Sequence, residues 1–406
     1  MVREQTTTLA VPLSDADATV QSMEDASPAK WHLAHTSWFF ETFVLVPYAK
    51  GYSLFSEVYP YLFNSYYEQV GDRFPRPTRG LLTRPSLDDV NSYRAHVDGA
   101  VERLLGKPLS AGVLALVELG LQHEKQHQEL MLTDILHLFA QNPMRPAYRE
   151  SQPLGVTPAS GTDAGWTEYA GGTACVGAAG DGFAFDCETP RHQVLLRPYR
   201  LSNHAVTNRQ WVAFIEDGGY ENTALWLSDG IAHVRDQGWQ APLYWEKQDG
   251  VWWSMTLRGF QPVDMDAPVT HVSFYEADGF AAWAGKRLPT EAEWEHAASG
   301  VPIEGNFAST GRMRPKPQSS RSDDKAPAGL FGDVWEWTAS AFLPYPGFKA
   351  ASGAVGEYNG KFMSGQMVLK GGSCASPSDH VRASYRNFFQ PEKRWQFSGL
   401  RLAEDA

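Results

Sequence analysis

The stretch LQHEKQHQELMLTDILH, residues 121–137, decides how the first part of the chain is interpreted, because it combines a helical pattern with two histidines. Residues four apart on an α-helix lie on one face. The stripe that we expect to face inward consists of Leu116, Gly120, His123, His127 and Leu130. Apolar residues normally fill such a stripe, so two imidazoles there need either hydrogen-bond partners in the core or a shared metal ion.

A third histidine has a similar setting on another predicted helix. His35 lies one turn from Trp31 and Trp38, so its side chain is also expected to face inward. Neutral imidazoles are common metal ligands, and three protein ligands with open positions are typical of catalytic metal sites. His35, His123 and His127 therefore have the pattern of a shared metal site, and the alternative is that they are hydrogen-bonded core residues. Residue types alone leave Zn(II), Fe(II), Cu(II) and Ni(II) open.

The remaining polar residues near these helices have no comparable grouping. His32, His96 and His137 are predicted to be surface or packing residues. Glu124 and Glu129 lie off the inward stripe, so they are predicted to support the ligands from outside or to be solvated.

Composition limits the function classes. The 406 residues carry 47 acidic and 35 basic side chains, a formal net charge of −12, which argues against a nucleic-acid partner. Three cysteines without a C-x-x-C pair fit a reducing compartment. No apolar run approaches the roughly 20 residues of a membrane span, and the N-terminus lacks a signal-peptide core. We expect a cytoplasmic protein with no membrane partner.

Helix signals dominate the first 150 residues. In the stretch 26–45, Ser27 is the expected N-cap with Pro28 at the first helical position. In the stretch 84–106, Ser86 and Asp89 have capping-box spacing. A third long helix is expected at about 110–140, and a fourth, weaker one before residue 25. Four helices with long connections predict a bundle.

The pattern of residues along the chain changes after a segment rich in Pro, Gly, Ser and Thr. Beyond it, short β-like runs alternate with Gly, Asn, Asp and Trp, and short helices are expected near 207–219 and at 290–299, where Thr290 and Glu293 form a capping box. The sequence predicts a multidomain α and α+β protein. Its predicted parts are a bundle with the metal site at 1–150, a linker at 151–165 and an α+β domain at 166–406.

Motifs in both halves carry a family resemblance. WHLAHTSWFFETF (31–43), FNSYYEQVGDRFPRPTRGLLTRPS (63–86) and HEKQHQELMLTDILH (123–137) resemble the DinB-like four-helix bundle of the ergothioneine-type sulfoxide synthases. The C-terminal motifs resemble the formylglycine-generating-enzyme fold, a variant of the C-type lectin fold. They are RLPTEAEWEHAA (287–298), GLFGDVWEWTAS (329–340), VLKGGSCASPSDHVRASYRNFF (368–389) and SYRNFFQPEKRWQFSGLRLA (384–403). The two halves in this order are strongly specific.

The resemblance implies a non-haem Fe(II) enzyme that uses O2 to couple a thiol to C2 of the imidazole of hercynine, giving a sulfoxide. It assigns the three iron ligands to His35, His123 and His127, and a contact with the hercynine imidazole to Gln126. The thiol is cysteine or γ-glutamylcysteine. The resemblance also implies an active site between the two domains.

Tyr66 and Tyr67 are the predicted catalytic tyrosines. Paired tyrosines in NSYYEQVG resemble the subgroup that takes free cysteine, and a tyrosine can supply the proton that the reaction with O2 requires. Aromatic packing is the alternative role for this pair.

Substrate contacts are expected from two segments. Aromatic faces suit the quaternary ammonium of hercynine, at roughly 0.5–2 kcal/mol each, and the segment with Arg386, Asn387, Phe388 and Phe389 offers them. Arginine forks suit the amino-acid carboxylates, and DRFPRPTRG supplies Arg73, Arg76 and Arg79. Core packing and surface solvation are the respective alternatives.

Three rival functions stay open at this stage. One is an ovothiol-type 5-histidylcysteine sulfoxide synthase, which often carries an added methyltransferase domain. Another is a DinB-like metal-dependent thiol transferase, and the third is a binding protein that uses the lectin-like domain. Only Cys374 lies where formylglycine-generating enzymes place a copper-binding cysteine pair, which argues against a copper oxidase.

Overall fold

The computed structural model describes residues 1–150, 165–180, 182–318 and 327–406. These residues form two compact units. Unit 1 comprises Met1–Arg149 and Ala351–Tyr358, and unit 2 comprises Glu150–Ala350 and Asn359–Ala406. The predicted linker, 151–165, lies outside the described residues except for residue 165.

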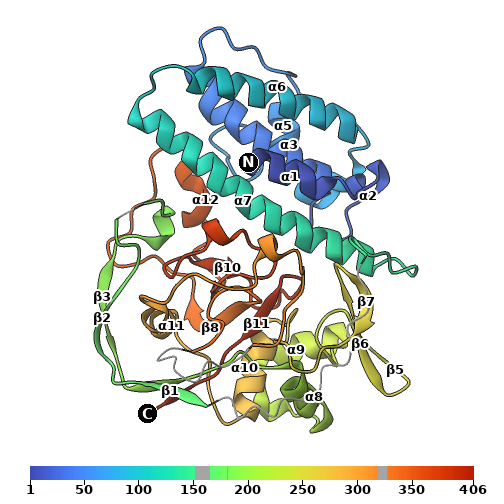
Figure 1. Cartoon of the computed structure of the whole chain (residues 1–406), viewed down its shortest axis with the longest axis vertical. Helices are drawn as coiled ribbons and strands as arrows, with labels where there is room; N and C mark the ends of the chain where they lie inside the picture. The colour runs from blue at the N-terminus through green and yellow to red at the C-terminus, as the bar shows by residue number, and fades with distance from the viewer. Residues whose placement is uncertain (151–164, 181, 319–326) are drawn as a thin grey trace. The chain divides into compact units, whose positions relative to one another are not determined.

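Among its described residues, unit 1 contains helices and no strand (Figure 1). Its α-helices are α1 (Val2–Ala10), α2 (Asp15–Thr19), α3 (Ala29–Phe40), α4 (Val46–Tyr48), α5 (Tyr59–Phe63), α6 (Leu87–Leu105) and α7 (Ala111–Ala140). A π-helix, η1 (Glu41–Leu45), continues α3, and a 3-10 helix, η2 (Arg76–Leu81), precedes α6.

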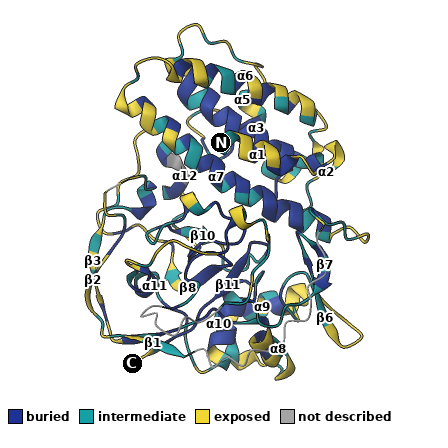
Figure 2. Ribbon diagram, in the orientation of Figure 1, coloured by how far each residue is buried: buried dark blue, intermediate teal, exposed yellow. Residues whose placement is uncertain are grey.

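Helix α3 is the centre of unit 1. It contacts α1, α2, α5, α6 and α7, and all of its residues are buried, as the dark ribbon in Figure 2 shows. Most apolar side chains of α3 join one core with those of α6 and the first half of α7. Polar side chains on a helix that is buried all round need hydrogen-bond partners inside the core. His32 and His35 are two such side chains of α3.

Local signals explain where α6 and α7 begin. Ser86 and Asp89 form the predicted capping box at α6, and Ser110 caps α7. The prediction for α3 was wrong by one residue, because Pro28 takes the N-cap position and no side chain caps the helix. Ser27 instead donates its backbone N–H to Asp134 Oδ2 and accepts a hydrogen bond from Arg79 Nη1 through its hydroxyl.

Unit 2 combines four small sheets with short helices (Figure 1). The strands are β1 (Trp166–Tyr169), β2 (Gly172–Val176), β3 (His192–Leu196), β4 (Tyr199–Ser202), β5 (Trp245–Gln248), β6 (Val251–Thr256), β7 (Gly259–Pro262), β8 (Trp335–Ala341), β9 (Met367–Lys370), β10 (Asn387–Phe389), β11 (Ser398–Leu400) and β12 (Ala403–Asp405). Their orders are β1-β4-β12, β10-β9-β8-β11, β2-β3 and β5-β6-β7.

The helices of unit 2 are short. The α-helices are α8 (Asn208–Glu216), α9 (Ser228–Gln237), α10 (Phe274–Trp283) and α11 (Glu291–Ala298), and α12 (Glu357–Gly360) lies at the boundary of the units. The 3-10 helices are η3 (Asp186–Glu188), η4 (Thr223–Leu225), η5 (Ala308–Thr310), η6 (Ala354–Gly356, assigned to unit 1) and η7 (Ser378–His380). Thr290 and Glu293 form the predicted capping box at α11.

The four-stranded sheet carries the segment that the sequence singled out for substrate contacts. Asn387 pairs with Leu369 and Phe389 with Met367, so β10 is an edge strand antiparallel to β9. On the other side β11 runs parallel to β8. A search of the described residues finds no helix with the length and hydropathy of a membrane span.

Candidate metal centre

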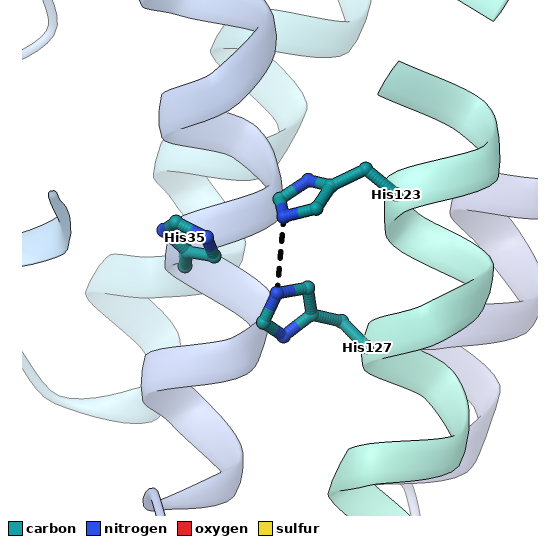
Figure 3. A group of neighbouring side chains, drawn as sticks. All are labelled: His35, His123 and His127. Carbon is teal, nitrogen blue, oxygen red and sulfur yellow. Dashed lines mark hydrogen bonds between the residues drawn. The ribbon is translucent and has the colours of Figure 1, made fainter. Parts of the chain in front are cut away.

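The three predicted ligand histidines come together inside unit 1. His35 projects from α3, and His123 and His127 project from α7 (Figure 3). One ligand nitrogen of each residue lies within 4.8 Å of the other two, and His127 Nε2 lies 3.1 Å from His123 Nε2. The four-residue spacing on α7 places two imidazoles on one face, and the packing of α3 against α7 adds the third.

Aromatic residues hold these imidazoles in place. Trp31 and Trp38 stack on His35, with ring centroids 4.5 Å and 5.3 Å away. Phe39 packs against His123 at 4.9 Å. Gly120, one turn before His123, leaves the space that the Phe39 and Phe40 rings occupy, because a Cβ atom there would lie 2.7 Å from Phe40 Cε1. An aromatic shell of this kind limits the access of solvent to a metal.

Burial keeps the three imidazoles neutral. It lowers the pKa of His123 to about 4, and it lowers the pKa values of His35 and His127 well below the usual value, with the neighbouring histidines adding to the effect. A neutral imidazole has one lone pair for a metal. His35 Nδ1 donates to Phe63 O over 2.6 Å, which leaves His35 Nε2 as the ligand atom. Three neutral nitrogen donors fit a divalent transition metal.

The prediction for His32 was wrong. Its side chain is 2% exposed; its Nδ1 lies 2.8 Å from His127 Nδ1, and its Nε2 lies 3.1 Å from Asp134 Oδ2. The sequence held a signal for this contact, since Asp134 lies seven residues after His127 and His32 three before His35, which are same-face helical spacings. The other two histidines fit the prediction better: His96 is exposed, and His137 bonds Ser22.

Glu124, next to the ligand His123, is fully buried and not solvated. Arg3 Nη1 and Arg94 Nη2 each lie 2.8 Å from one of its carboxylate oxygens. The pKa of Glu124 is about 2: burial alone would raise it, and the two guanidinium groups overcome that effect. This ion triad ties α1 and α6 to α7 immediately beside the metal ligands. Glu129 is partly buried.

The predicted catalytic tyrosines differ in their surroundings. Tyr66 is partly buried, and its hydroxyl accepts a hydrogen bond from Arg76 Nη1. The guanidinium carbon of Arg73 lies 5.6 Å from the centroid of its ring. Tyr67 is 3% exposed and packs against Trp38, whose ring stacks on His35. Tyr67 thus contacts a residue that stacks on a candidate ligand, whereas Tyr66 contacts arginines.

The three predicted carboxylate-binding arginines gather on one side of unit 1. Arg73 Nη1 donates to Ser65 O over 2.7 Å, and Arg76 donates to Asp25 O as well as to Tyr66. Arg79 is 3% exposed and lies over the Trp31 ring. Among the described residues no carboxylate pairs with Arg79, and burial together with Arg76 lowers its pKa. Binding of an anion would stabilise a buried cation in this state.

Gln126 lies on α7 one residue before His127 and is partly buried. Its predicted contact with a substrate stays a prediction.

Arg386, one of the predicted substrate contacts, has a structural role in unit 2. Its Nε and Nη2 bind Glu291 over 2.9 Å and 3.1 Å, and its remaining donors bind Cys187 O and Leu343 O. The side chain is 0% exposed. Because its donors are occupied inside unit 2, its assignment as a substrate contact was wrong.

The next three residues form β10 and are all partly buried. Phe388 stacks on Phe342 with ring centroids 4.0 Å apart, whereas Phe389 meets the Trp395 ring edge-on at 5.8 Å. The Asn387 side chain accepts a hydrogen bond at Oδ1 from the backbone N–H of Phe388, in the same strand. The stack on Phe342 gives Phe388 the packing role that was the alternative for this segment.

Comparison with known proteins places both halves of the chain. Residues 1–131 match the model of the DinB superfamily, and residues 165–326 and 327–406 match that of the sulfatase-modifying factor enzyme 1-like domain. The two units thus have the fold classes that the sequence predicted. The structure of PvdO from Pseudomonas aeruginosa covers 59% of this chain and 94% of its own, with 19% identity and a TM-score of 0.41.

Curated relatives match over nearly the whole length. A hercynine oxygenase of Mycolicibacterium thermoresistibile is 33% identical over 97% of this chain and 91% of its own. That of Mycobacterium tuberculosis is 32% identical over 97% and 95%. A formylglycine-generating enzyme of Streptomyces coelicolor is 31% identical but covers only 60% of this chain. The chain therefore belongs to the hercynine oxygenase family and is an oxygenase.

Proposed function

We propose that this protein is a non-haem Fe(II)- and O2-dependent sulfoxide synthase of ergothioneine biosynthesis. It joins cysteine, or γ-glutamylcysteine, to C2 of the hercynine imidazole. The observation that carries the proposal is the buried cluster of His35, His123 and His127, whose ligand nitrogens lie within 4.8 Å of one another, in a chain that matches hercynine oxygenases almost end to end. The low cysteine count supports a cytoplasmic location.

In this proposal the three histidines hold Fe(II). Bound iron supplies open coordination positions for a thiolate and for O2, together with redox chemistry that side chains lack. The protein contributes neutral imidazoles and an aromatic shell that excludes water around them. Holding both organic substrates beside one centre replaces an encounter of several molecules by a positioned reaction.

Tyr66 and Tyr67 are the proposed proton donors. A phenol at the edge of the centre can deliver a proton during the reaction with O2. Without that delivery we expect oxidation of the thiol alone. The hydrogen bond from Arg76 orients the Tyr66 hydroxyl, and packing against Trp38 fixes the Tyr67 ring.

The substrates require cation and aromatic contacts. Arg73, Arg76 and Arg79 are the proposed partners of the amino-acid carboxylates, and Arg79 is the strongest candidate because it is buried and forms no salt bridge with a described carboxylate. Gln126 is the proposed contact of the hercynine imidazole. Asn387 and Phe389 remain the proposed contacts of the quaternary ammonium.

The decisive experiment is anaerobic reconstitution with Fe(II), followed by O2 and mass spectrometry of the products. Hercynine is offered with cysteine or γ-glutamylcysteine, and plain histidine with cysteine forms a parallel arm. We expect a hercynine–cysteine sulfoxide and O2 consumption that depends on both substrates. A product formed only from plain histidine, or no oxygenated product, would refute the proposal.

The same assay applied to His123→Ala links the chemistry to the centre. Removal of one of three ligands should abolish stoichiometric iron binding and product formation while the bundle stays folded. Full iron content in this variant would show that the cluster is not the iron site.

A further inference from the structure

The side chains of His127, His32 and Asp134 form one continuous hydrogen-bonded chain inside unit 1. His127 Nδ1 lies 2.8 Å from His32 Nδ1, and His32 Nε2 lies 3.1 Å from Asp134 Oδ2. The same carboxylate oxygen accepts the backbone N–H of Ser27 over 2.8 Å. All three side chains are at most 7% exposed, so their hydrogen bonds must be satisfied within the protein.

The carboxylate sets the direction of this chain. An ionised carboxylate only accepts hydrogen bonds, so His32 donates to Asp134 from Nε2. A neutral His32 then has a lone pair on Nδ1, which can only accept, and His127 must be the donor in the contact between the two Nδ1 atoms. His127 thus carries its proton on Nδ1 and keeps the lone pair on Nε2, the atom that lies 3.1 Å from His123 Nε2.

The opposite direction is incompatible with a metal at this position. If His32 donated from Nδ1, whether neutral or protonated, His127 would accept on Nδ1 and would carry its own proton on Nε2. That proton would point at His123 and would occupy the position of the metal. Ring-nitrogen roles in a ligand histidine are set by the hydrogen bond at its other nitrogen.

We propose that His32 and Asp134 are positioning residues of the metal centre, which fix the tautomer and the orientation of His127. Asp134 holds the proton of His32 on Nε2, and His32 holds the proton of His127 on Nδ1. The inference rests on the proposed function only in requiring that a metal binds the three histidines.

His35 and His127 differ in the kind of group that fixes the tautomer. His35 has its Nδ1 proton fixed by the backbone carbonyl of Phe63, a partner that no substitution removes. His127 depends on a side chain that is itself oriented by another side chain. The tautomer of His35 is thus fixed by a backbone group and that of His127 by a side chain. Of these two, the tautomer of His127 is the one that a point substitution can alter.

The test is metal affinity, measured without turnover. Fe(II) under anaerobic conditions, and Co(II) followed by its visible absorption, are titrated into metal-free protein against a competing chelator. We expect His32→Phe and Asp134→Asn to weaken binding of both metals about 10- to 100-fold, the usual effect of removing such an outer partner. The Asn amide can donate to His32, which permits the wrong tautomer.

A conservative variant separates positioning from packing. In His32→Gln the amide oxygen can accept from His127 and the amide N–H can donate to Asp134, so the direction of the chain is kept. We expect His32→Gln to bind metal more tightly than His32→Phe, although Phe preserves the ring shape better. His137→Phe is the matched control, because His137 lies on α7 but bonds Ser22, and it should keep wild-type affinity.

The outcomes distinguish the two proposals. If the wild-type protein binds metal and folded His32→Phe and Asp134→Asn bind it equally well, the positioning role is refuted and the proposed function stands. If His32→Phe binds better than His32→Gln, packing is the role of His32 and the inference fails. A wild-type protein that binds neither metal would refute both. The double variant His32→Phe/Asp134→Asn should lose no more than His32→Phe alone, since the two residues act as one unit.

Discussion

The guanidinium carbon of Arg79 lies 3.4 Å from the centroid of the Trp31 ring. The Trp31 ring also stacks on the metal-ligand candidate His35, with ring centroids 4.5 Å apart. Arg79 donates to two hydroxyl groups, of Ser27 and Ser65, and among the described residues no carboxylate pairs with it. The carboxylate of Asp134 attracts this cation, but among the described residues no carboxylate forms a salt bridge with it. A substrate carboxylate can therefore bind Arg79 one ring away from the candidate metal centre.

Replacing that cation should separate stability from binding. Arg79→Met keeps most of the side-chain volume and removes a buried charge that has no anionic partner, so we expect unchanged or higher stability in urea. The same change removes charge-assisted hydrogen bonds of about 1.5–3 kcal/mol, so KM for hercynine or for the thiol should rise roughly 10- to 100-fold. Steady-state assays that vary one substrate at a time identify which carboxylate Arg79 binds.

Arg94→Met is the matched control, because Arg94 is equally buried but pairs with Glu124 over 2.8 Å. Its loss leaves Glu124 with one guanidinium partner, Arg3, and should destabilise the protein by about 3–5 kcal/mol. If Arg79→Met were as destabilising as Arg94→Met and left both KM values unchanged, the anion-binding role of Arg79 would be excluded.

The two tyrosines can be told apart by the products they allow. We expect Tyr66→Phe or Tyr67→Phe to shift the product from the sulfoxide towards cysteine sulfinate, because a missing proton donor diverts the reaction to the thiol. The ratio is measured by mass spectrometry at equal O2 consumption. Tyr52→Phe serves as a control, since its hydroxyl donates to Glu41. An unchanged ratio in both variants would remove the tyrosines from the mechanism.

The parts of the fold that sequence reasoning recovered depend on short-range chemistry. The capping boxes of Ser86 with Asp89 and of Thr290 with Glu293 join residues three apart, so the sequence displays both partners together. The spacing of His123 and His127 is of the same kind. For His35 the pattern indicated only an inward direction, and family resemblance supplied the common metal.

The errors concern contacts set by tertiary packing. His32 was assigned to the surface or to packing, without a polar partner, because Asp134 lies 102 positions away on another helix. Arg386 was assigned as a substrate contact. Its ion pair with Glu291, 95 positions away, has no signal in the neighbouring sequence. Polar residues on a helix buried all round, like α3, must have internal partners, but only the packed structure identifies them.

Close packing around the centre gives a stability prediction at Gly120. In Gly120→Ala the new methyl group would lie 2.7 Å from Phe40 Cε1 and 3.1 Å from Phe39 Cδ1. Overpacking of this kind costs about 1–3 kcal/mol, more than the ~1 kcal/mol that alanine gains in helix propensity. We expect a lower free energy of unfolding in urea, with weaker metal binding because Phe39 packs on His123.

Gly112→Ala is the control on the same helix. Its Cβ would meet only Ser110 Oγ, at 4.0 Å, so this variant should gain about 0.4–1 kcal/mol of stability. Equal effects of the two substitutions would show that the rings of Phe39 and Phe40 move aside at little cost.

The last prediction concerns acid stability in unit 2. His271 is buried, and burial lowers its pKa to about 3, against 6.5 when unfolded. As the pH falls below 6.5, His271 binds a proton in the unfolded chain but not in the folded protein. The contribution of His271 to the free energy of unfolding is therefore full above pH 6.5 and declines towards pH 3. The loss through this group should reach about 2 kcal/mol at pH 5.

His271→Asn tests this assignment. His271 has a φ of 63°, a conformation that asparagine tolerates better than most residues, so the variant removes the titrating ring with little backbone strain. Its free energy of unfolding in urea should fall less steeply between pH 7.5 and pH 5 than that of the wild type. Tyr244→Phe controls for packing, because the Tyr244 ring contacts His271 at 4.8 Å, and it should keep the wild-type slope. Parallel slopes for His271→Asn and the wild type would mean that His271 is free to take up its proton in the folded state.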